Sequence, residues 1–174
     1  MTPSLPLNIL VLCTGNSARS ILAEALFNHL GGGRIRAFSA GSQPAGRINP
    51  VALETLAKHA VPAPVDARSK SWDEFCRPGA PRIDAVFTVC GSAAAEVCPV
   101  WPGQPLKVHW GIADPAHVEP LAARQAAFET AYQALARRIA AFVALDLANL
   151  PHADLATAAQ GIHETALKDE EVQA

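Results

Sequence analysis

The segment that most constrains the fold of this chain lies near its start. A continuous apolar run from Asn8 to Cys13 (NILVLC) has the character of a buried strand. A short turn containing Gly15 follows, and from Ser20 to Leu30 apolar residues recur at helical spacing. The sequence therefore predicts a buried strand that passes through a tight turn directly into a helix, which is typical of α/β domains.

The same alternation continues along the chain. The further segments expected are strands at Arg34–Ala40, Ile83–Cys90 and Leu106–His109, helices at Pro50–Ala60 and Leu121–Leu145, and a short helix or loop at Gly91–Val97. Strands that alternate with helices favour a parallel sheet covered on both faces. We therefore predict an α/β fold, a single three-layer domain with a four-stranded parallel sheet, for which 174 residues with 50% hydrophobic content are sufficient.

Composition excludes several classes of partner. The net charge is −2 and the 14 Lys and Arg residues are scattered, so neither a nucleic acid nor a membrane is expected as a partner. No segment approaches the ~18 apolar residues of a membrane span, and the first residues lack the pattern of a leader, so a cytoplasmic location is expected. Four cysteines in a reducing compartment are a poor disulfide framework, so each is either a buried or a reactive thiol.

The turn after the first strand has the composition of an oxyanion-binding loop. Successive backbone N–H groups and a helix N-terminus can converge there on one tetrahedral anion, and the same groups favour a thiolate at Cys13. Arg19 can bind two oxygens of that anion through its planar guanidinium. The predicted anion-binding residues are Thr14, Gly15, Asn16, Ser17, Ala18, Arg19 and Ser20.

The run LCTGNSARS resembles the signature loop of the low-molecular-weight tyrosine phosphatase superfamily and of its thioredoxin-coupled arsenate reductase branch. The resemblance implies a flavodoxin-like topology, with Cys13 as the nucleophile and Arg19 as the residue that holds the substrate. It covers roughly Asn8 to Leu145. We therefore expect a catalytic domain at residues 1–150 and a C-terminal extension at 151–174, which should be partly helical or frayed because it ends in LKDEEVQA.

A second match lies after the fourth expected strand. HWGIADP resembles the reductase branch, and the resemblance makes Asp114 the general acid that protonates the departing oxygen. Phosphatases of the family place tyrosines after this Asp-Pro to stack on an aromatic substrate. Here Ala116 and His117 follow, and the only tyrosine is Tyr132, so an aryl phosphate has little to stack on.

Thiol number also separates the two activities, because moving two electrons onto arsenate requires a second thiol that attacks the first. The segment VCGSAAAEVCPVWP resembles the redox segment of the reductases, which implies Cys90 as the resolving thiol and Cys98 as the final one. The alternative reading makes both thiols buried packing groups, and we assign that role to Cys76. Cys13, Cys90 and Asp114 all follow strand ends, so they should meet at one rim of the sheet.

The resemblance leaves three questions open. Asn16, Glu24 and Ser39 match positions of a potassium site in the family, but Ala67 and Ser69 stand where oxygen-rich partners would be expected, so at most a weak potassium site is implied. No bound cofactor is expected, and the external thiol reductant is thioredoxin in preference to glutaredoxin with glutathione. The alternatives to arsenate reduction are a phosphatase that hydrolyses phosphomonoesters through a phosphocysteine, and a non-catalytic oxyanion or redox sensor.

Overall fold

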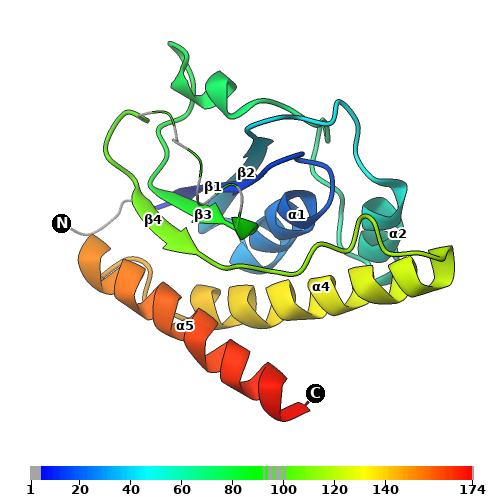
Figure 1. Ribbon diagram of the computed structural model, residues 1–174. Coiled ribbons are helices and arrows are strands. Elements are labelled where there is room, and N and C mark those ends of the chain that lie inside the picture. The colour runs from blue at the N-terminus through cyan, green and yellow to red at the C-terminus, as the bar shows by residue number, and fades with distance from the viewer. Residues whose placement is uncertain (1–4, 92, 94–95, 97–98, 100, 174) are drawn as a thin grey trace.

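The computed structural model describes residues 5–91, 93, 96, 99 and 101–173. Four parallel strands form one sheet in the order β2-β1-β3-β4, which confirms the predicted α/β fold and its flavodoxin-like strand order (Figure 1). The strands are β1 (Leu7–Cys13), β2 (Ile35–Gly41), β3 (Ala85–Thr88) and β4 (Leu106–His109). The helices are α1 (Arg19–Gly31), α2 (Pro50–Lys58), α4 (Leu121–Val143), α5 (His152–Gln173) and the short 3₁₀ helix η1 (Trp72–Cys76).

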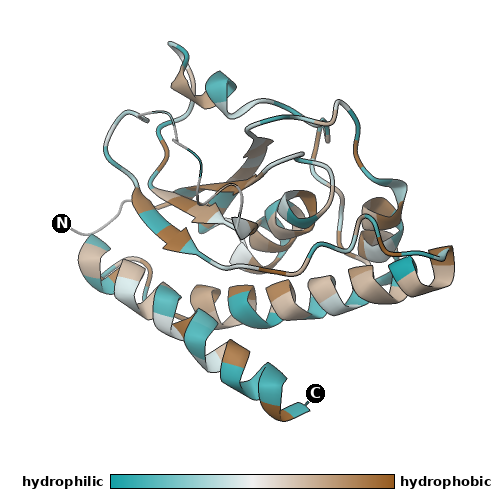
Figure 2. Cartoon of the chain, in the orientation of Figure 1, coloured by the Kyte–Doolittle hydropathy of each residue, from teal (hydrophilic) through white to brown (hydrophobic). Residues whose placement is uncertain are grey.

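The central strand β1 divides the core into two parts. Its side chains alternate, so Ile9 and Val11 pack on the side of α1 and α4, whereas Leu10 and Leu12 pack against the cluster around Trp72 in η1. Figure 2 shows the apolar residues gathered on the strands and the polar ones along the outer helix surfaces. Within the described ranges, no helix is both long and apolar enough to cross a membrane.

Most element boundaries follow from local signals that the sequence displays. Helix α1 ends where Gly32 takes a left-handed conformation (φ 57°), and α2 begins with Pro50 after the Asn49 side chain caps it by accepting from the Val51 N–H. Strand β3 is shorter than the predicted Ile83–Cys90, since only Ala85–Thr88 lie in the ladder. Much of the segment expected as a short helix or loop at Gly91–Val97 lies outside the described residues.

The C-terminal extension forms helix α5, which packs on α4 and β4. Its polar end is tied to α4, because Glu170 accepts from both terminal nitrogens of the fully buried Arg138, at 2.7 and 2.9 Å. The Arg138 Nε also donates to His163 Nδ1 at 3.0 Å, and the Trp110 indole donates to the Ala159 carbonyl at 2.9 Å. The extension is thus held by polar contacts that the amphipathic pattern alone does not reveal.

The contact between Arg138 and Glu170 leads to a first prediction. Hydrogen bonds from Arg138 and then Arg137 hold the pKa of Glu170 far below its usual value, at about 2. Because the pKa in the folded state is depressed, the pair stabilises the fold above about pH 4.5, and this stability is lost as the pH falls towards 2. Glu170→Gln should therefore cost about 3 kcal/mol at neutral pH, the low end for leaving a buried charge unpaired, since Glu170 is partly exposed.

That loss should lower the melting temperature by about 6–12 °C, at ~2–4 °C per kcal/mol for a chain of this size. The exposed neighbour Glu171 provides the matched control, and Glu171→Gln should leave the melting temperature unchanged. In thermal melts at pH 7 and pH 3, the difference in melting temperature between the variant and the parent chain should be smaller at pH 3. An equal gap at both pH values would contradict the assignment.

Candidate active site

Hydrogen bonds from neighbouring segments hold the backbone carbonyl groups of the loop between β1 and α1. The Thr14 carbonyl accepts from the Gln43 N–H at 3.0 Å, and the Ser17 carbonyl accepts from the Asn49 N–H at 2.9 Å. The Gly15 carbonyl accepts from the Ala45 N–H and from Ser69 Oγ, both at 2.9 Å. With these carbonyls held by the neighbouring segments, the N–H groups of the loop are available to the cleft, as an anion-binding nest requires.

The curvature of the loop depends on two backbone positions. Asn16 adopts a left-handed conformation (φ 47°), which asparagine tolerates better than most residues, and its Oδ1 accepts from the Lys70 N–H at 2.9 Å. Gly41, paired with Cys13 in the sheet, lies so close to the loop that a Cβ there would collide with the Thr14 carbonyl oxygen. A glycine at position 41 is therefore required for the loop to close over the end of β2.

Cys13 lies at the base of a cleft of about 690 Å³ and is 4% exposed. Its sulfur is 2.9 Å from Ser20 Oγ. Ser20 Oγ already accepts a hydrogen bond from Asn16 Nδ2 at 2.9 Å, so its own proton is available for the sulfur. The contact suits a thiolate, which accepts hydrogen bonds more strongly than a thiol.

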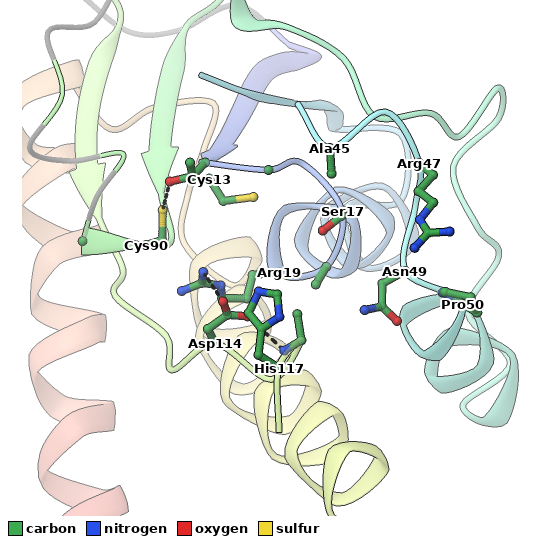
Figure 3. Close-up of a pocket in the computed structure, with 15 residues that line it drawn as sticks. Cys13, Ser17, Arg19, Ala45, Arg47, Asn49, Pro50, Cys90, Asp114 and His117 are labelled. Atoms are coloured by element: carbon green, nitrogen blue, oxygen red, sulfur yellow. Dashed lines mark hydrogen bonds and ion pairs between the residues drawn. The ribbon is translucent and has the colours of Figure 1, made fainter. Parts of the chain in front are cut away.

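Arg19 and Asp114 stand together on one side of this cleft (Figure 3). The Arg19 guanidinium donates to the Ile112 carbonyl at 2.8 Å and lies 3.4 Å from Asp114 Oδ2. Asp114 Oδ1 accepts from the Ala116 N–H at 3.0 Å, which orients the carboxyl group. An oxyanion entering the loop would compete with Asp114 for the Arg19 guanidinium.

Of the thiols predicted to react, Cys90 reaches the same cleft. It is 4% exposed, its sulfur is 3.5 Å from Thr14 Oγ1, and it accepts from the Ala93 N–H at 3.3 Å. Cys76 lies on η1, packed against the core on the opposite face of the sheet, and burial raises the pKa of its thiol, which agrees with a packing role. Cys98 lies outside the described residues.

The residues that the sequence resemblance matched to a potassium site lie in one cluster with the ammonium group of Lys70. Asn16 presents its amide nitrogen to Ser39 Oγ at 2.9 Å, and Ser39 donates to the Glu24 carboxylate. The Lys70 ammonium lies 3.9 Å from Glu24 Oε1. A donor amide and a resident ammonium do not suit a metal cation, so these residues do not fit a potassium site.

Burial and the charge of the partner shift the pKa values of Glu24 and Lys70 in opposite directions. Burial raises the pKa of the Glu24 carboxyl and lowers the pKa of the Lys70 ammonium. The charge of each partner opposes the effect of burial on the other. Each group therefore helps to keep the other ionised.

The sequence interpretation missed several residues of this site. Arg47, Asn49 and His117 line the cleft, the first two at the end opposite Asp114 (Figure 3). Lys70 and Gly41 support the loop from behind. A glycine at the end of a strand could have signalled a close approach, but nothing in the local sequence marks Arg47 or Lys70.

Fold and site together define a class of proteins in which a strand, a loop and a helix surround a cysteine with anion-binding groups. The chain belongs to the low molecular weight phosphotyrosine protein phosphatase family, whose model matches residues 8–152. A relative named arsenate reductase, from Halalkalibacterium halodurans, is 36% identical over 111 residues, which are 64% of this chain and 76% of that protein.

Two solved structures extend the comparison. An arsenate reductase from Archaeoglobus fulgidus superposes with a TM-score of 0.62 at 26% identity, over 79% of this chain and 99% of that one. A thioredoxin-dependent arsenate reductase from Corynebacterium glutamicum superposes with a TM-score of 0.53 at 28% identity, over 77% of this chain and 60% of that one.

Proposed function

We propose that this chain is an arsenate reductase that uses Cys13 as the nucleophile and Cys90 and Cys98 as a thiol relay. The observation that carries the proposal is that Cys13, Cys90 and Asp114 line one cleft, with Thr14 in contact with the Cys90 sulfur. A hydrolase needs only the first thiol and the acid. A second thiol in the same cleft supplies the electrons that reduction of arsenate requires.

The first step is a substitution at arsenic. Arsenate enters the loop and binds the loop N–H groups and Arg19. The Cys13 thiolate then attacks arsenic, an As–O bond breaks, and the departing oxygen leaves as water with a proton that Asp114 relays from solvent after the anion has displaced it from Arg19. The product is a thioester of arsenate on Cys13, with arsenic still in the pentavalent state.

The second step reduces arsenic. The Cys90 thiolate attacks the Cys13 sulfur, a Cys13–Cys90 disulfide forms, and the electron pair of the S–As bond stays on arsenic, which leaves as arsenite. Two thiols have then lost two electrons, which balances the change from As(V) to As(III). Cys98 next attacks Cys90, which frees Cys13 and leaves a Cys90–Cys98 disulfide for an external reductant.

Thioredoxin is the reductant we propose, because its dithiol matches an internal protein disulfide and the Corynebacterium glutamicum neighbour is described as thioredoxin-dependent. Glutaredoxin with glutathione is the competing supply of electrons. We place the reaction in the cytoplasm, since a relay through free thiols requires a reducing compartment.

Phosphomonoester hydrolysis is the second candidate, because a phosphocysteine on Cys13 could be opened by water. The cleft disfavours an aromatic substrate, however. Among the described residues that line it, none is Phe, Tyr or Trp, and the charged side chains are Arg19, Arg47 and Asp114. A small, multiply charged oxyanion suits such a lining better than an aryl phosphate does.

The proposal is tested by incubating the purified chain with arsenate, thioredoxin, thioredoxin reductase and NADPH. Arsenite should accumulate over many turnovers, with one NADPH oxidised per arsenite formed. Replacing thioredoxin with glutaredoxin and glutathione identifies the reductant. Hydrolysis of an aryl phosphate without arsenite production would assign a phosphatase, and a single disulfide without turnover would assign a sensor.

The role of Asp114 leads to a separate prediction. Asp114→Asn should slow the first attack on arsenate by ~10²–10⁴-fold, the usual contribution of a general acid. Phosphate binding should stay the same or become tighter, because the variant no longer presents a carboxylate to Arg19. The exposed Glu119, which pairs with Arg124, supplies the control Glu119→Gln. Rapid-quench kinetics with equal rates in parent and variant would place the acid elsewhere.

A further inference from the structure

A continuous path of hydrogen bonds runs from the nucleophile to a buried carboxylate. Ser20 Oγ contacts the Cys13 sulfur, and the Asn16 amide donates its two protons to Ser20 and Ser39, each at 2.9 Å. Ser39 in turn donates to Glu24. An amide nitrogen can only donate, so Ser39 must accept from Asn16 and must find its own acceptor in Glu24. The direction of the path therefore makes Glu24 an acceptor, a role that the ionised carboxylate fills more strongly than the neutral acid.

Lys70 supplies the positive charge at the end of this path. Its side chain is 11% exposed and that of Glu24 is 9% exposed, and their charged atoms lie 3.9 Å apart. The ammonium also donates to the Arg68 carbonyl at 3.1 Å, while the Lys70 N–H holds the Asn16 side chain from the other side. Lys70 thus contacts the path at two points: its backbone N–H binds Asn16, and its ammonium group lies beside Glu24.

We propose that Lys70 is a positioning residue whose ammonium serves as a tethered monovalent cation beside Glu24. It keeps that carboxylate ionised as the acceptor for Ser39. The hydrogen bond from Ser39 to Glu24 in turn fixes Asn16 in its left-handed conformation and leaves the Ser20 proton directed at Cys13. The inference rests on the proposed role of Cys13 as the nucleophile, but it concerns the reactivity of Cys13 before substrate binds rather than arsenate turnover.

A tethered cation has a consequence that a packing residue lacks. If the ammonium is removed, Glu24 remains buried with no fixed positive partner and becomes a site for a cation from solution. The reactivity of Cys13 should therefore be indifferent to potassium in the parent chain and should depend on potassium in a variant without the ammonium. Lys70→Met tests this, because it keeps most of the aliphatic stem and removes the charge.

The probe is the rate at which iodoacetamide alkylates Cys13, followed by mass spectrometry of the Cys13 peptide, with inorganic phosphate as the protecting anion. In choline chloride, Lys70→Met should slow alkylation about three- to tenfold, because the Cys13 sulfur then lacks part of the hydrogen-bond support that the path provides. Exchange of choline chloride for potassium chloride at equal ionic strength should restore at least half of that loss. Lys70→Arg, which keeps a cation, should show a smaller loss.

Two controls make the outcome specific. Lys168→Ala removes an exposed lysine from α5 and should change nothing. The double variant Lys70→Met with Glu24→Gln should lose the response to potassium, because the receiving carboxylate is gone. A potassium effect on the parent chain, or a slow Lys70→Met variant that potassium does not rescue, would overturn the proposal. Thermal melts of every variant identify any loss that is due to unfolding, and none of these readouts requires arsenate reduction.

Discussion

Cys13→Ser should abolish arsenate reduction and any hydrolysis of aryl phosphates together. Both reactions begin with attack by the same thiolate, and a serine hydroxyl in the same loop is far too weak an acid to replace it at neutral pH. Removal of one residue of a serine protease's catalytic triad costs about 10⁴–10⁶ in rate, so both activities should fall by at least ~10⁴-fold.

The fold and the anion site should survive this substitution. A serine hydroxyl is smaller than the thiol and can keep the hydrogen bond to Ser20, and the loop carbonyls remain held by the segment around Gln43 and Asn49. Phosphate titrations should therefore give an affinity close to that of the parent chain. Cys76→Ser, which changes a thiol on the other face of the sheet, is the matched control and should keep full activity. Turnover retained by Cys13→Ser would refute the assignment of the nucleophile.

The fold was largely predictable from the sequence because its determinants are local. The apolar run that ends at Cys13, the left-handed cap at Gly32 and the proline at the start of α2 each fix an element from nearby residues alone. The order of the strands then follows from the resemblance carried by the loop. The end of β3 was placed too late, because the apolar pattern continues to Cys90 after the ladder has stopped at Thr88.

The contacts that support the loop and the C-terminal helix were not predictable from the sequence, because they join residues far apart in the chain. Lys70 reaches Glu24 across 46 positions, and Arg138 reaches Glu170 across 32. A lysine in a loop and an arginine within a helix look like ordinary surface residues until the fold buries them. The C-terminal helix is the clearest example, because the ion pair between Glu170 and Arg138 adds to the small buried stripe of Leu155, Ala159 and Ala166.

Cys90→Ser should separate the two activities that Cys13→Ser removes together. Without the resolving thiol, the arsenate thioester on Cys13 has no thiolate to attack its sulfur, so arsenite production should fall to the background of the assay. Phosphocysteine can still be opened by water, so hydrolysis of an activated aryl phosphate should stay close to the parent rate. A serine hydroxyl can keep the contacts with Thr14 and the Ala93 N–H, which limits any structural loss.

The matched variant is Cys98→Ser, which should stop the relay one step later. In that variant a single turnover should release one arsenite and leave a Cys13–Cys90 disulfide, whereas Cys90→Ser should release none and form no disulfide at Cys13. Peptide mapping after one turnover distinguishes the two results directly. If Cys90→Ser instead releases arsenite repeatedly at the parent rate, the second thiol of the cleft is a packing residue, and the electrons must enter from a thiol outside the chain.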